Sequence, residues 1–196
     1  MERTEQASRG KMDSFSYLSV LLSIIVGLAV TQILQGVRML ILARSTARLY
    51  APSLIWAALL LLIATQMWWS AFELREQPVW TFWLYGIILI QVGLLYLASG
   101  LVLPDLRPHE IDLEADYFAN RRWFFGLLAG TAVASILKDV ELYGALPHRA
   151  NLLFHLVMIA SCCAAIVIAN RRYHAILAPA SLVFFVVYIA LLFARL

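Results

Sequence analysis

The sequence has little charge for its length. Only 14% of its 196 residues are Asp, Glu, Lys or Arg, whereas 63% are hydrophobic, and the mean hydropathy is +0.82. A water-soluble domain of this size could not cover so much apolar side chain, because its surface must be largely polar or mixed. The net charge of +3 is also too small to indicate nucleic-acid binding. The composition therefore indicates an integral membrane protein whose main partner is the lipid bilayer.

Cysteine and chemical motifs are also scarce. The only two cysteines, Cys162 and Cys163, are adjacent within an apolar run. Neighbouring cysteines rarely bridge each other, so we expect small packing residues. No Gly-x-Ser-x-Gly, His-Glu-x-x-His or phosphate-binding glycine loop occurs, and paired membrane histidines for haem are missing. The sequence therefore predicts no cofactor and no metal, and it gives no recognisable nucleophile–base pair that would predict an enzyme.

Long apolar runs, in contrast, are abundant. Six of them approach or exceed the about 20 residues that cross about 30 Å of hydrocarbon as a helix. In lipid only helices and closed barrels satisfy the backbone, and unalternating runs of this length indicate helices. We predict an all-α bundle of six transmembrane helices as a single domain over 13–196, after a disordered polar tail at 1–12. The predicted helices cover 15–42, 53–72, 80–103, 123–142, 152–169 and 175–193.

The one sizeable loop, at 104–120, is acidic. Between positions 105 and 116 it holds five acids and one arginine. The alternating acids at 112, 114 and 116 resemble a calcium loop, but Tyr117 and Trp123 stand where that motif needs glycine and glutamate. We therefore expect a solvated loop that ends where Asn120 caps the next helix.

Basic residues predict the orientation. Loops one, three and five carry eight arginines, and the opposite side carries seven basic residues, of which three precede Met12. The stretch from Met12 reads like a natural start, and without the tail the comparison is eight against four. The positive-inside rule then puts both termini outside. No cleavable signal peptide is expected, because the first apolar run is too long for one.

A weak internal repeat suggests a duplication. Residues 27–37 and 130–140, which are 103 positions apart, are identical at six of eleven positions. A duplication of three helices plus three would be inverted, as in many transporters. Apolar segments also match by chance, and the match does not extend convincingly into the next helix.

Ionisable residues near the ends of the spans are the first candidates for a site. Charge in the bilayer core costs about 2.5–3.5 kcal/mol even on a lenient scale, so each such group needs a partner or water. Alternation of the spans brings one group of these residues to the same side. Either they form a structural ion-pair cluster, most simply Lys138 with Glu73, or they form a proton or solute site in which His155 titrates. The predicted cluster consists of Glu73, Lys138, Asp139, Glu141 and His155.

Uncharged polar residues inside the spans are the second set of candidates. A glutamine in mid-membrane must find hydrogen bonds, either by packing between helices or by contacting a solute. Small residues repeat every four positions in the first run and in the fourth, which is typical of close helix contacts within a bundle or between subunits. The predicted cavity lining consists of Thr31, Gln32, Gln35, Gln66 and Gln91.

Two short segments suggest a relationship. The segments 15–24, Phe-Ser-Tyr-Leu-Ser-Val-Leu-Leu-Ser-Ile, and 121–127, Arg-Arg-Trp-Phe-Phe-Gly-Leu, resemble an uncharacterised group of bacterial six-helix membrane proteins. The resemblance covers most of the chain from Met12 onward. It implies a bacterial inner membrane and no particular activity.

Three functions stay open at this point. The leading hypothesis is a small-solute or proton-linked transporter or channel-like protein, based on the charged cluster and the polar residues inside the spans. The second is a non-catalytic accessory, sensor or scaffold subunit, with a membrane partner or a homo-oligomer as its setting. The third is an intramembrane enzyme acting on lipid, which a deep lateral cleft ending at Lys138 and His155 would favour.

Overall fold

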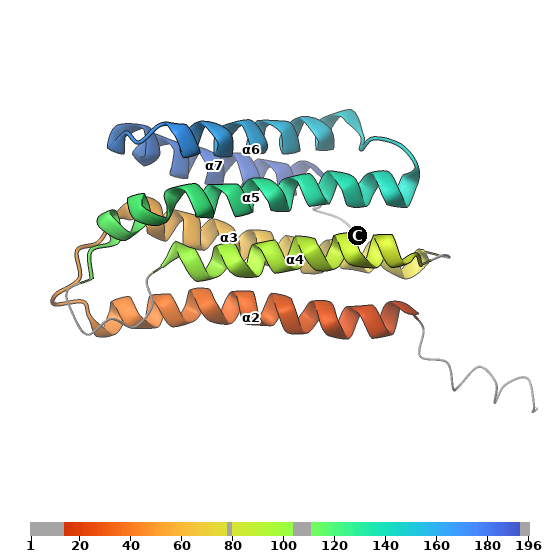
Figure 1. Ribbon diagram of the computed structural model, residues 1–196, viewed down its shortest axis with the longest axis horizontal. Coiled ribbons are helices and arrows are strands. Elements are labelled where there is room, and N and C mark those ends of the chain that lie inside the picture. Colours follow the sequence, from red (N-terminus) through yellow and green to blue (C-terminus); the bar gives the residue numbers. More distant parts are fainter. Residues whose placement is uncertain (1–13, 78–79, 104–110, 193–196) are drawn as a thin grey trace, which may run out of the picture.

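The computed structural model describes residues 14–77, 80–103 and 111–192. Within these residues lie six long helices, each long and apolar enough to cross a membrane, so the predicted all-α, six-helix fold is confirmed. Successive helices run in opposite directions and form one elongated bundle (Figure 1). The elements are α2 (Ser14–Leu42), α3 (Ala51–Ser70), the 3-10 helix η1 (Ala71–Glu76), α4 (Phe82–Val102), α5 (Leu113–Tyr143), α6 (Arg149–Val167) and α7 (Arg171–Leu192).

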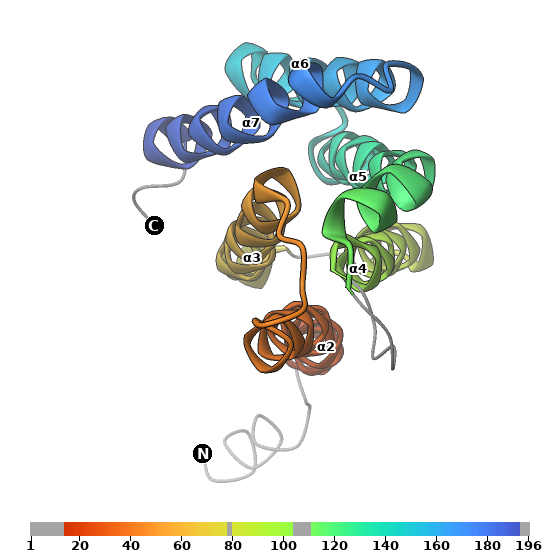
Figure 2. The same ribbon diagram turned by 90° about the vertical axis from the view of Figure 1, so that its left-hand side faces the viewer.

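The helices are arranged in layers when the bundle is viewed along its length (Figure 2). The first helix, α2, packs on α3 and α4, and α5 packs between α4 and α6. The last helix, α7, closes the bundle against α3 and α6. We call the end where α2, α4 and α6 begin the Lys138 end, and the opposite end, where α3, α5 and α7 begin, the His174 end.

The outward faces of the helices are apolar. Phe82, Val167 and Ile176 are 81%, 79% and 71% exposed. The interior is apolar as well, with Trp56 and Phe125 fully buried and in edge-to-face contact. A water-soluble bundle keeps its apolar residues on an inner stripe, whereas these helices are apolar all round, as a lipid environment requires. By helix length and hydropathy the chain is therefore a polytopic membrane protein.

The acidic loop is shorter than predicted. The helix α5 begins at Leu113 rather than near Trp123, and its N-cap is Asp112 rather than Asn120. The Asp112 carboxylate accepts hydrogen bonds from the backbone N–H groups of Glu114 (3.0 Å) and Ala115 (3.1 Å). Acidic side chains in a first helical turn also interact favourably with the helix dipole. The alternating acids are therefore the start of a helix, and the prediction of a loop through position 120 was wrong for that part.

Two glycines lie where a larger side chain would collide with a neighbouring residue. A Cβ atom at Gly36 of α2 would lie 2.6 Å from the Cβ of Leu103, the residue that follows α4. At Gly130 of α5 a Cβ would lie 3.2 Å from a methyl group of Leu94 on α4. At Gly27 and Gly126, in contrast, no described residue lies within 4 Å of that position. Gly130, which belongs to the predicted row of small residues in α5, thus makes a close helix contact. Gly36 makes one too, although it lies outside the row of α2, and Gly27 and Gly126 have no such contact among the described residues.

Candidate functional site

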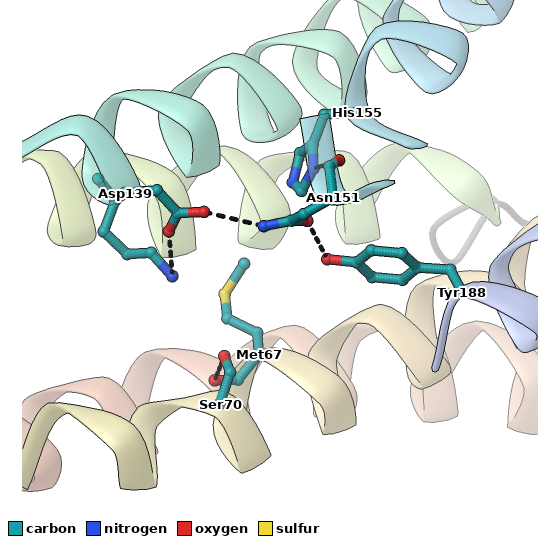
Figure 3. Close-up of polar contacts among 7 residues, drawn as sticks. Met67, Ser70, Asp139, Asn151, His155 and Tyr188 are labelled. Atoms are coloured by element: carbon teal, nitrogen blue, oxygen red, sulfur yellow. Dashed lines mark hydrogen bonds and ion pairs between the residues drawn. The ribbon is translucent and has the colours of Figure 1, made fainter. Parts of the chain in front are cut away.

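A chain of polar contacts joins three helices at the Lys138 end (Figure 3). Lys138 Nζ of α5 lies 3.5 Å from Asp139 Oδ1. The other carboxylate oxygen of Asp139 accepts a hydrogen bond of 3.0 Å from Asn151 Nδ2 on α6. Tyr188 of α7 donates its hydroxyl hydrogen to Asn151 Oδ1, also at 3.0 Å. The amide of Asn151 thereby links the charged pair of α5 to the aromatic ring of α7.

His155 lies one helical turn after Asn151. Its Nδ1 is 2.8 Å from the Asn151 carbonyl oxygen, which can only accept, so Nδ1 carries the hydrogen and donates it. The imidazole meets the ring of Tyr188 edge to face, with centroids 5.9 Å apart. The position of the ring is thus fixed by its own helix and by α7.

The charged pair is largely withdrawn from the surface. The side chains of Lys138 and Asp139 are 17% and 12% exposed. Two opposite charges at this depth compensate each other only if their remaining hydrogen-bonding groups also find partners. Asp139 has one in Asn151, whereas the side chain of Lys138 borders two cavities.

Two adjoining cavities lie between α3, α4, α5, α6 and α7. The first, of about 100 Å³, is at the Lys138 end, and most of its lining is polar. The second, of about 70 Å³, lies deeper in the bundle and has a mostly apolar lining. Five side chains border both cavities, namely Gln66, Met67, Gln91, Ser135 and Tyr188. Gln91 is the tenth of the 21 residues of α4, so the cavities reach about the middle of that helix.

The structure places five of the ten predicted site residues at these cavities. Gln66 and Gln91 border both, Lys138 and Asp139 border the polar one, and His155 borders the apolar one. They come together because α3, α5 and α7 end where α4 and α6 begin, as the alternation of spans predicted.

One predicted member of the charged cluster, Glu141, lies away from the cavities, and a second, Glu73, is not tested. Glu141 is exposed and accepts a hydrogen bond of 3.1 Å from the hydroxyl of Thr81, the N-cap of α4. The side chain of Glu73 lies outside the described residues, so the predicted pairing with Lys138 stays a prediction. The partner that the structure gives Lys138 is its neighbour Asp139.

The three polar residues of α2 do not border either cavity. The Thr31 hydroxyl donates to the Gly27 carbonyl of its own helix at 2.7 Å, and both Thr31 and Gln35 are exposed. Gln32 is half-buried and donates a hydrogen bond of 3.1 Å to the hydroxyl of Tyr96 on α4. Gln32 is therefore a helix-packing contact.

Sequence reasoning missed Asn151 and Tyr188. Asn151 lies among the first residues of α6 and one position before the predicted fifth helix at 152–169, and Tyr188 lies within the predicted last helix at 175–193. The sequence does show an amide at the start of one helix and a phenol near the end of another. Such groups need hydrogen-bond partners when they are buried, so both were candidates for the site.

A second polar cluster lies at the His174 end and was also missed. The imidazole of His174 is fully buried. Its Nε2 lies 2.8 Å from the Ile168 carbonyl oxygen and its Nδ1 lies 2.8 Å from the Tyr117 hydroxyl. Because a carbonyl only accepts, Nε2–H donates to it and Nδ1 accepts from Tyr117. One turn after Tyr117, Arg121 donates to the Ile166 carbonyl at 3.2 Å. These contacts tie the start of α5 to the connection between α6 and α7.

Among the residues that the structure describes, no group of three His, Cys, Asp or Glu side chains is placed to hold a metal ion. Cys162 and Cys163 are both free thiols, the first buried and the second exposed.

The chain was compared with family models, with curated proteins and with solved structures, and none of the three comparisons found a match. What the fold and its sequence support is a six-helix protein with six candidate membrane spans.

Proposed function

We propose that the protein is a small-solute transporter of a bacterial inner membrane and that the two adjoining cavities are its substrate site. The observation that carries the proposal is the buried Lys138–Asp139 pair beside a polar cavity. Charge inside a membrane bundle is costly and is found mainly where it binds substrates or ions or forms a proton relay. The extension of the cavities to Gln91 gives such a site the depth that transporter sites have, near the middle of the membrane.

The arginine distribution supports an orientation for this site. Arg44, Arg48, Arg122, Arg171 and Arg172 are at the His174 end. By the positive-inside rule this end faces the cytoplasm, which leaves both termini and the polar cavity at the outer face. The cavity is then placed to take up a solute from outside.

Solvent access to the cavity tests the proposal. Ser135 borders both cavities, so a Ser135→Cys variant without the two native cysteines is expected to react with a water-soluble, membrane-impermeant maleimide added from outside. The matched control is Ser99→Cys, since Ser99 is buried and hydrogen-bonded to its own helix at 2.9 Å. Equal, negligible labelling at both positions would count against a hydrated site.

The alternative is an accessory, sensor or scaffold subunit. It is favoured by the polar contacts among Asp139, Asn151 and Tyr188, because a structural cluster that fixes α5, α6 and α7 would look the same. It is also favoured by Thr31 and Gln35, which are exposed on a membrane helix where a second subunit could cover them. This function predicts a stable partner on purification in mild detergent, and a lone monomer would count against it.

A further inference from the structure

The two cavities differ in chemistry although they adjoin. The polar one is bordered by the charges of Lys138 and Asp139 and by the hydroxyl groups of Ser70 and Ser135. The deeper one is bordered mainly by hydrocarbon and aromatic side chains, among them Leu128 and Phe185. A ligand that fills both must be polar at one end and apolar at the other.

The charged side chains at the polar cavity favour a ligand with a particular net charge. One ammonium and one carboxylate lie 3.5 Å apart, so the site is electrically neutral. A ligand with a net charge would leave one charge uncompensated at low dielectric constant, which is strongly unfavourable. A zwitterion leaves none, because its carboxylate pairs with Lys138 and its ammonium pairs with Asp139.

Both side chains can accept such partners without losing the ones they have. The Lys138 ammonium has three donors and a single close carboxylate among the described residues, at 3.5 Å. A carboxylate has about four acceptor sites, of which Asp139 uses one for Asn151 and one for Lys138. Lys138 also borders the cavity that lies toward α2 and α3, whereas Asp139 bonds to α6, so the two charges point to different sides.

The volumes limit the size of the ligand. The apolar cavity of about 70 Å³ is roughly half of the about 150 Å³ that binds benzene in an engineered apolar cavity. It therefore holds about three or four carbon atoms. The polar cavity of about 100 Å³ has the volume of about three water molecules in the liquid, enough for a carboxylate and an ammonium on one carbon.

We propose that the substrate is an α-amino acid with a short aliphatic side chain, whose zwitterionic head lies in the polar cavity against Lys138 and Asp139 and whose side chain enters the apolar cavity. This inference rests on the proposed transport function and names the substrate class of the same site. L-Valine is the probe that matches both volumes.

Dissecting the ligand tests the inference on the wild-type protein. Binding to the protein in detergent is measured by the shift in melting temperature and by calorimetric titration. L-Valine is expected to bind at least tenfold more tightly than isovalerate, which lacks the ammonium, and than isobutylamine, which lacks the carboxylate. Glycine is expected to bind more weakly because it leaves the apolar cavity empty, and L-tryptophan because it exceeds that cavity. Isovalerate or isobutylamine binding as tightly as L-valine would overturn the inference.

Charge variants give a second readout that a structural role would not produce. Lys138→Gln leaves Asp139 alone and is expected to lose L-valine while gaining affinity for isobutylamine. Asp139→Asn leaves Lys138 alone and is expected to gain affinity for isovalerate. Arg149→Gln and Glu141→Gln are the matched controls, since both residues are exposed at the same end and border neither cavity. Loss of L-valine binding without the two opposite gains would contradict the assigned contacts.

The failure of this inference is distinguishable from the failure of the transport function. If Ser135→Cys is labelled from outside and some other small solute binds while L-valine does not, only the substrate class is wrong. If no small solute binds and Ser135→Cys is not labelled, the transport function is wrong as well.

Discussion

At the residue scale, the stability of the bundle depends on the charged pair of Lys138 and Asp139 and on the groups that compensate it. Asp139 is held from two sides, by the Lys138 ammonium and by the Asn151 amide. In a bundle with so few internal polar groups, removal of either charge leaves the other buried without its counterion. Breaking a buried pair in this way typically costs about 3–5 kcal/mol, whereas replacing both partners by apolar residues is often neutral or stabilising.

We therefore expect Lys138→Met alone to lower the melting temperature in detergent markedly, and the double variant Lys138→Met/Asp139→Leu to recover most of the loss. The physical reason is that the double variant has no unpaired charge to bury. Melting curves of the wild type, both single variants and the double variant form a complete thermodynamic cycle. If the double variant were as unstable as the sum of the single variants, the two side chains would not act as a pair. If Lys138→Met alone left the melting temperature unchanged or raised it, the pair would not contribute to stability, and only a functional role would then explain the buried charge.

The sequence allowed part of this site to be predicted. Four of its residues stand out as polar side chains in or beside apolar runs, namely Gln66, Gln91, Lys138 and Asp139. Alternation of the spans is enough to predict which helix ends lie on the same side of the membrane. Their actual partners were not predictable, because a hydrogen bond of 3.0 Å between Asn151 and Asp139 depends on the rotation of two helices about their axes. Hydropathy gives the length of a helix in a membrane, and in helices that are apolar all round it gives little about rotation.

At the scale of single elements, the helix boundaries show where local chemistry outweighs hydropathy. The apolar part of α5 begins near Trp123, but the helix itself begins ten residues earlier, at Leu113 (123 − 113 = 10). The Asp112 cap and the acids of the first turn stabilise these extra turns in a polar setting. Arg48 adds two backbone hydrogen bonds in a parallel bridge beside Asp112: its N–H donates to the Ile111 carbonyl at 2.8 Å, and its carbonyl accepts from the Leu113 N–H at 3.1 Å.

Close packing of α2 is expected to depend on one of its glycines and not on another. Gly36→Ala places a methyl group 2.6 Å from the Cβ of Leu103 and is expected to cost about 1–3 kcal/mol, because backbone or side chain must shift. Gly27→Ala, in the same helix, meets no neighbour within 4 Å and is expected to be neutral or to stabilise by up to about 1 kcal/mol through helix propensity.

The two variants are compared by their melting temperatures in the same detergent. Equal destabilisation would indicate that the Gly27 face is packed as tightly as the Gly36 face, by a partner outside the described residues.

At the scale of the whole molecule, the length and hydropathy of the helices do not indicate which end of the bundle faces the cytoplasm. The distribution of basic residues does. We expect a C-terminal alkaline phosphatase fusion to be active and a C-terminal green fluorescent protein fusion to be dark, because the positive-inside rule puts that end outside. Fusions truncated after position 46, in the loop between α2 and α3, are expected to give the opposite pair of results. Fluorescence of the full-length fusion would reverse the orientation and put the polar cavity on the cytoplasmic side.

The relation between the two halves of the chain also belongs to this scale. Three helices precede the acidic segment and three follow it, as an inverted duplication requires, and the segments 27–37 and 130–140 lie in α2 and α5. The duplication stays a prediction, because alternating helices would give the same count without any common origin.

The length of α5 has a mechanical consequence. Tyr117 and Asp139 are 22 residues apart on this helix (139 − 117 = 22), or about 33 Å at 1.5 Å per residue. Each is bonded to a different neighbour, Tyr117 to the start of α7 and Asp139 to the start of α6. The helix is therefore attached to a different neighbour at each end. If α5 tilted as a unit about its midpoint, its two ends would move in opposite directions, and a wider polar cavity would be accompanied by a strained Tyr117–His174 hydrogen bond.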